Sequence, residues 1–179
     1  MKRILLFIAV SISLLGCEGN GVESIDPGTI EIRLKIINRG FINSDRFDLT
    51  VQSLKIERND NAYADIFDNI HSLRDNPDSY NIFSDSLFVI GESYIPEGNF
   101  KKLLIMFSPP DSMTYNNRMI SVTKPPSFDG LYELDYDIQT AANRRIIVTV
   151  ACKIDSILTK KIDHFEYSHN FFIDRIELN

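Results

Sequence analysis

Apolar and polar residues alternate with a period of two along most of the chain after residue 29. In the clearest stretch, Ile30, Ile32, Leu34 and Ile36 alternate with charged residues, which is typical of a β-strand with one buried face and one face in water. Alternation or a short apolar run recurs in segments 47–51, 54–56, 87–90, 103–107, 115–122, 134–138, 146–152 and 162–178. No apolar pattern with a helical period is long enough to predict a major helix.

The alternation changes phase once, between residues 51 and 54. Apolar residues of segment 47–51 share one face, but Leu54 and Ile56 would then point to the opposite face. A slip of one residue reverses every later side chain of a strand. We therefore expect a β-bulge near residues 52–53, which would restore the buried face.

The turn signals between these segments set the fold class. Segment 103–107 is apolar at every position and predicts a central strand that is covered on both faces. Proline, glycine and asparagine separate the segments. The pattern predicts an all-β protein, a two-sheet antiparallel β-sandwich of about eight or nine strands. A closed β-barrel is the alternative.

The first residues have the pattern of a bacterial lipoprotein signal. Lys2 and Arg3 precede an apolar run over residues 4–15, which is too short for a transmembrane helix. The run ends in Leu14-Leu15-Gly16-Cys17, which resembles a lipobox. This resemblance implies cleavage before Cys17 and acylation of that cysteine, for example by palmitate. The alternative is an ordinary secretory signal with a chance cysteine.

We expect three parts in the chain: a signal peptide over residues 1–16, the lipidated Cys17 with a flexible tether to residue 28, and one sandwich domain over residues 29–179. Only Cys152 remains besides the anchor cysteine, so an intramolecular disulfide is not expected. The net charge of −6 argues against nucleic acid as a partner.

The order of the apolar segments resembles a known family. Phe47-x-Leu49-x-Val51-x-x-Leu54-x-Ile56 is followed by Ile95-Pro96-Glu97-Gly98-Asn99-Phe100 and a strand-like run, then by Leu134-x-Tyr136-x-Ile138 and Ile146-x-Val148-x-Val150. This order over residues 47–150 resembles a domain-of-unknown-function family of bacterial lipoproteins. The resemblance implies a transthyretin-like (prealbumin-like) sandwich, and it transfers no catalytic residue.

The segment around residues 163–169 holds a candidate metal site. His164, Glu166 and His169 are residue types that bind zinc. The two histidines are five residues apart, however, and not at the spacing that places both on one face of a zincin helix. The alternative is that all three are ordinary polar surface groups.

Three carboxylates share one face of the strand expected at 134–138. Glu133, Asp135 and Asp137 would repel one another if unpaired. Either a hard cation such as Ca²⁺ binds them, or basic residues of a neighbouring strand neutralise them. The candidates to lie opposite the carboxylates are the basic residues that follow in the chain: Arg144, Arg145 and Lys153.

Aromatic residues of the proline-flanked loops are candidate ligand contacts. These are Tyr80, Tyr115, Phe128 and Tyr132. Loop aromatics can stack on sugars or dock peptides, but they also cover the undersides of loops. The aromatics of the last segment are expected in the core: Phe165, Tyr167, Phe171 and Phe172.

The sequence favours a binding protein over an enzyme. Nucleophile-elbow and phosphate-loop motifs are not found in it, and no cofactor is expected. We expect a non-enzymatic, lipid-anchored protein of the bacterial cell envelope, at the outer membrane or cell surface rather than the inner membrane. Its partner would be a glycan or another envelope protein. The alternatives are a subunit or anchor of a surface assembly, and a metal-binding protein or enzyme that uses residues 163–169.

Overall fold

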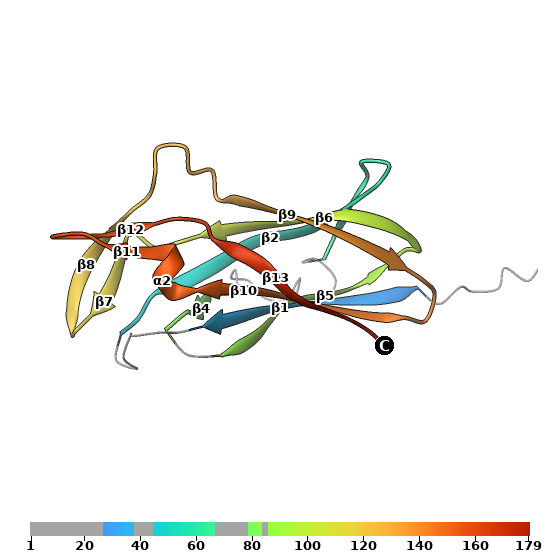
Figure 1. The fold of residues 1–179 in the computed structure, drawn as a ribbon, viewed down its shortest axis with the longest axis horizontal. Coiled ribbons are helices and arrows are strands. Elements are labelled where there is room, and N and C mark those ends of the chain that lie inside the picture. Colours follow the sequence, from blue (N-terminus) through green and yellow to red (C-terminus); the bar gives the residue numbers. More distant parts are fainter. Residues whose placement is uncertain (1–26, 38–44, 67–78, 84–85) are drawn as a thin grey trace, which may run out of the picture.

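A computed structural model describes residues 27–37, 45–66, 79–83 and 86–179 of the chain (Figure 1). Within these ranges the chain forms nine strands of four residues or more, four strands of three residues and one four-residue helix. The predicted all-β class is confirmed. The described strands form three open sheets, none of which closes on itself, so the sandwich holds and not the barrel.

The first layer, here called the β1 sheet, has the strand order β13-β10-β1-β5. Its strands are β13 (Phe171–Leu178), β10 (Arg145–Lys153), β1 (Gly28–Ile37) and β5 (Leu87–Ile95). β1 runs parallel to β10 and antiparallel to β5. The predicted sandwich is therefore mixed at this position and not purely antiparallel.

The second layer, the β6 sheet, has the order β3-β2-β6-β9, and β4 also pairs with β2. Its strands are β2 (Asp48–Arg58), β3 (Tyr63–Asp65), β4 (Ser79–Asn81), β6 (Gly98–Ser108) and β9 (Leu131–Thr140). The register of β2 against β6 shifts between Val51 and Ser53. This confirms the bulge that the phase change predicted.

A small third sheet, the β8 sheet, has the order β11-β12-β8-β7. Its strands are β7 (Ser112–Tyr115), β8 (Arg118–Thr123), β11 (Leu158–Lys160) and β12 (Phe165–Tyr167), and the helix α2 (Ile154–Ile157) leads into β11. Figure 1 shows this sheet at the left end of the molecule, whereas β1 begins at the right end. The two ends of the sandwich therefore carry different elements.

The core lies between the β1 and β6 sheets. Ile30, Ile32, Leu34 and Ile36 of β1 are all buried, as are the apolar residues that face them from β2 and β6. Gly91 of β5 shows how closely the layers approach, because a side chain there would collide with Leu54 of β2. Burial of these alternating faces is the main stabilising contribution to the fold.

The strand that is covered on both faces is not the one that the sequence suggested. β6 is central in its sheet, but Leu104 and Met106 within its apolar run are only half-buried. In β10, by contrast, every residue from Ile146 to Cys152 is buried. β10 lies between β1 and β13 in its sheet, and these flanking strands could not be read from the sequence of β10 itself.

Candidate functional site

The outer face of the β1 sheet, which is turned away from the core, carries a row of charged residues along β1. Because side chains alternate along a strand, the isoleucines of β1 point into the core while Glu31, Arg33 and Lys35 point outward. The register places Thr149 of β10 between Arg33 of β1 and Arg175 of β13. Residues far apart in the sequence therefore meet on this face.

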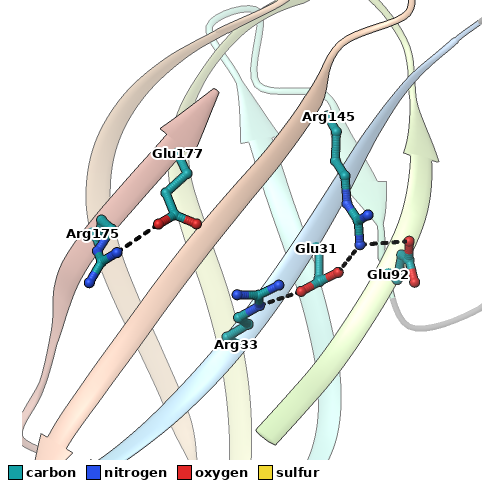
Figure 2. A network of polar contacts seen from close by, with 6 residues as sticks. All are labelled: Glu31, Arg33, Glu92, Arg145, Arg175 and Glu177. Carbon is teal, nitrogen blue, oxygen red and sulfur yellow. Dashed lines mark hydrogen bonds and ion pairs between the residues drawn. The ribbon is translucent and has the colours of Figure 1, made fainter. Parts of the chain in front are cut away.

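Glu31 is the buried centre of this charged face. It is only 3% exposed, and Arg33 Nε and Arg145 Nη2 each donate a hydrogen bond to its carboxylate. Arg145 also lies 3.7 Å from Glu92 of β5. Figure 2 shows Glu31 between the two arginines, with Arg145 reaching on to Glu92.

The charge of Glu31 is maintained by its arginine partners. Burial alone would raise the pKa of this carboxyl group, but hydrogen bonds from Arg33 and Arg145 outweigh burial and lower the pKa below its ordinary value. The hydrogen bond between Glu31 and Arg145 also raises the pKa of Arg145. The buried carboxylate is thus ionised at neutral pH and fixes the positions of both guanidinium groups.

A groove of about 340 Å³ runs over Thr149 on this face. Arg33 and Lys35 of β1 form one wall, and Leu87 of β5 lies at its end. The other wall is formed by three residues of β13: Asp174, Arg175 and Glu177. We call this the Thr149 groove. Its floor is formed by a short side chain of β10, whereas longer side chains rise on both sides.

Ion pairs order the walls of the Thr149 groove. Lys35 Nζ lies 3.0 Å from Asp174 Oδ2 and so links β1 to β13 across β10. Arg175 Nη1 donates to Glu177 Oε1 over 2.7 Å along β13. In Figure 2, Arg33 and Arg175 lie on opposite sides of β10. The groove can therefore offer guanidinium and ammonium donors from two sides to one ligand.

The candidate metal residues are not brought together. His164 Nδ1 lies 2.7 Å from Asp163 Oδ1, and Glu166 is paired with Lys161 over 2.8 Å. His169 lies instead in an aromatic cluster, with its ring centroid 4.7 Å from that of Phe128. No three His, Cys, Asp or Glu side chains in the described ranges are placed to hold a metal ion. The trio predicted from His164, Glu166 and His169 is therefore not a three-ligand site.

Burial explains the state of the His169 ring. Its Nε2 atom is buried and has no hydrogen-bond partner within the described part of the chain. Burial lowers its pKa, although the charge of Asp129 and a hydrogen bond with the Leu131 backbone oppose the change. The ring is therefore neutral near pH 7 and packs as part of the aromatic cluster.

The four candidate ligand aromatics are partly buried and pack against the core: Tyr80, Tyr115, Phe128 and Tyr132. Tyr132, for example, accepts a hydrogen bond from the backbone of Phe171 over 3.1 Å and donates one to the same residue. Only Phe128 lies in a loop, because Tyr80, Tyr115 and Tyr132 belong to β4, β7 and β9. Their packing matches the alternative in which these aromatics cover the core.

Three of the four tail aromatics are buried as expected: Phe165, Tyr167 and Phe171. Phe172 departs from the expectation because it is 36% exposed. It follows Phe171 on β13, where successive side chains point to opposite faces. The sequence pair Phe171-Phe172 therefore divides between the core and the outer face of the β1 sheet.

The carboxylate strand is neutralised in part by a residue that the sequence did not suggest. Glu133 of β9 is paired with Lys102 of β6 over 2.8 Å, because β6 is the neighbour of β9. The interpretation with Arg144, Arg145 and Lys153 opposite this strand was wrong. Arg145 begins β10 in the other sheet, where it binds Glu31.

The structure describes Cys152 but not Cys17. Cys152 is buried in β10, and burial raises the pKa of its thiol to about 12, so it is a packing residue. Cys17 and the lipobox lie outside the described residues. Lipidation at Cys17 therefore stays a prediction from the sequence.

Sequence reasoning did not single out the Glu31 network or the Thr149 groove. The alternating charges Glu31, Arg33 and Lys35 are visible in the sequence as the polar face of one strand. Their partners on β10 and β13 lie more than 100 residues away. Only the parallel pairing of β1 with β10 reveals the network.

In the described part of the chain, no helix combines the length and apolar character needed to cross a membrane. No protein-family model, curated protein or solved structure matches the sequence or the fold of this chain.

Proposed function

We propose that this chain is a non-enzymatic, lipid-anchored protein of the bacterial cell envelope, and that its sandwich binds a partner through the outer face of the β1 sheet. The observation that carries the binding part is the Thr149 groove, in which charged side chains from β1 and β13 surround a short side chain of β10. The lipid anchor rests on the lipobox at Cys17. We place the domain at the outer membrane or cell surface.

The position of β1 supports this arrangement. Only residues 18–27 separate Cys17 from the first residue of β1. A chain of that length spans at most about 35 Å, so the Gly28 end of the sandwich would stay near the membrane. β1 therefore serves both as the continuation of the tether and as one wall of the groove.

The placement of the potential nucleophile supports binding over catalysis. Cys152 lies on the core face of β10, and its thiol has a raised pKa. The neutral ring of His169 is enclosed by aromatic residues. Neither residue lines the Thr149 groove, whose charged groups suit recognition by hydrogen bonds and ion pairs.

Cell fractionation tests the anchor and the exposure of the domain together. The chain with a carboxyl-terminal epitope tag is expressed as wild type and as Cys17→Ser, and intact cells are treated with proteinase K beside a periplasmic control protein. We expect wild type in the membrane fraction, with its tag removed from intact cells, and Cys17→Ser released from the membrane. Retention of Cys17→Ser in the membrane fraction would contradict the anchor, and protection of the tag until lysis would contradict surface exposure.

A second candidate function is a subunit or anchor of a surface assembly. Among the described strands, β5 and β13 form the two edges of the β1 sheet. Both edges carry exposed apolar residues, such as Val89 on β5 and Leu178 on β13. Exposed strand edges can pair with another chain. Light scattering over a concentration series would show oligomers in that case, whereas a ligand-binding monomer would keep one mass.

A further inference from the structure

The geometry points to a ligand class for the Thr149 groove: we propose that it binds a sulfate or phosphate ester group, held between Arg33, Lys35 and Arg175. This inference rests on the proposed binding function and deepens it. A tetrahedral oxyanion presents acceptors in several directions, and these three cations approach the groove from both of its walls.

The register brings two guanidinium groups to the two sides of one residue. Arg33 on β1 and Arg175 on β13 are both direct neighbours of Thr149 on β10. Neighbouring strands lie about 4.8 Å apart, so the two arginine backbones are roughly 10 Å apart on one face. Because each guanidinium group already pairs with one carboxylate, Glu31 or Glu177, an oxyanion between them would bind through their remaining N–H donors.

The existing ion pairs leave donors for a ligand. A guanidinium group has five N–H donors. Arg33 reaches Glu31 through Nε, and Arg175 reaches Glu177 through Nη1. Each ion pair thus uses only part of its arginine, and the remaining donors can form the paired N–H contacts with which arginine binds phosphate and sulfate.

Glu31 acts as a positioning residue for this site. Because its carboxylate is buried and accepts a hydrogen bond from Arg33, it holds the guanidinium group in place before a ligand arrives. Lys35, which is linked to Asp174 over 3.0 Å, is held beside the same groove. Such preorganisation reduces the entropy lost on binding.

The size and surroundings of the groove favour an ester over a bare ion. A volume of about 340 Å³ is within the range of small-molecule sites and leaves room for a sugar-sized group beside the anion. Leu87 at the end of the groove is 53% exposed and offers an apolar surface to that group. The chain is acidic overall, and Asp174 and Glu177 also line the groove. Attraction of the anion therefore depends on direct contacts with Arg33, Lys35 and Arg175 and should weaken with salt.

The test uses the intact chain, purified in an uncharged detergent, and amide NMR titrations at constant ionic strength. The probes are sodium sulfate, sodium phosphate, glucose 6-sulfate and glucose 6-phosphate, with sodium chloride and glucose as controls. We expect shifts that cluster on β1, β10 and β13 near Arg33, Thr149 and Arg175. Preference for one ester identifies which oxyanion source the site selects.

Variants assign the binding to the groove. Arg175→Gln and Lys35→Gln each remove one exposed cation, and we expect each to weaken ester binding about tenfold while the amide spectrum stays folded. Arg46→Gln is the matched control, because Arg46 forms a similar pair with Asp48 two residues along the chain. It should bind the esters as wild type does.

Three results would overturn the inference: equal shifts with chloride, glucose binding as tightly as its esters, or unchanged affinity in both groove variants. None of these results bears on the lipid anchor, which is tested at Cys17. Conversely, loss of the anchor would leave ester binding by the domain intact. The two proposals therefore fail separately.

Discussion

Replacement of Glu31 by glutamine tests the buried ion network most directly. The carboxylate side chain is 4% exposed and accepts hydrogen bonds from two arginines. A hydrogen bond to a charged group contributes about 1.5–3 kcal/mol, but Arg33 and Arg145 keep side-chain exposures of 28% and 49% and can regain water. We therefore expect Glu31→Gln to lower the free energy of unfolding by about 2–3 kcal/mol.

Urea denaturation at pH 7 measures this loss, and Tm should fall by roughly 4–12 °C. The matched control is Glu177→Gln, which breaks the pair with Arg175 on the same sheet. That pair is solvent-exposed, so its loss should change the free energy of unfolding by less than about 0.5 kcal/mol. Equal effects of the two substitutions would refute the assignment of Glu31 as the buried centre of the network.

The pH dependence gives the sign of the same effect. Because the pKa of Glu31 is lowered in the folded state from its ordinary value of 4.5, its ionised form is stabilised by folding. This contribution is fully present above pH 4.5 and is lost as the pH falls through the lowered folded value. The stability difference between wild type and Glu31→Gln should therefore shrink in acid. A difference that grows below pH 4 would contradict the direction of the pKa change.

Three further substitutions or reactions test the packing. Tyr132→Phe removes the hydroxyl that forms hydrogen bonds with the backbone of Phe171. We expect the free energy of unfolding, measured by urea denaturation, to fall by about 1–2 kcal/mol. A variant as stable as wild type would show that these hydrogen bonds are not formed. Gly91→Ala places a methyl group against Leu54 and should lower the free energy of unfolding by about 1–3 kcal/mol. The same substitution should cost less in a Leu54→Ala background, where the colliding side chain is absent. A neutral Gly91→Ala would contradict the close approach of the sheets. In the folded Cys17→Ser chain, Cys152 should not react with a thiol reagent at pH 8, because burial raises its pKa to about 12. The same thiol should react when the chain is unfolded in urea. Rapid labelling of the native chain would place this thiol outside the core.

Local patterns were sufficient to predict the β class and several details of β2. The alternation of segment 47–56 located both the strand and its bulge, because burial of one face makes the phase of side chains informative.

The segment 115–122, in contrast, is not one strand but parts of β7 and β8. Asn116 and Asn117 form the turn between them with φ angles of 49° and 61°. Asparagine tolerates such angles, so this pair was the signal for a hairpin.

The site could not be predicted in the same way, because its residues meet only through strand order. Arg145 was expected opposite the carboxylates of β9, since the two segments follow one another in the chain. The structure places them in different sheets, and Arg145 binds Glu31 through the parallel pairing of β10 with β1. Single-sequence periodicity identifies which face of a strand is polar, but it does not identify the neighbouring strand.

Labelling with palmitate tests the central claim, a lipid-anchored binding domain, most directly. Cells that express wild type or Cys17→Ser are grown with labelled palmitate, and the purified protein is analysed for label and for the mass of its amino-terminal peptide. The account predicts label in wild type alone, on a chain that begins at Cys17. Label that persists in Cys17→Ser, or a wild-type chain with an unmodified Cys17, would contradict it.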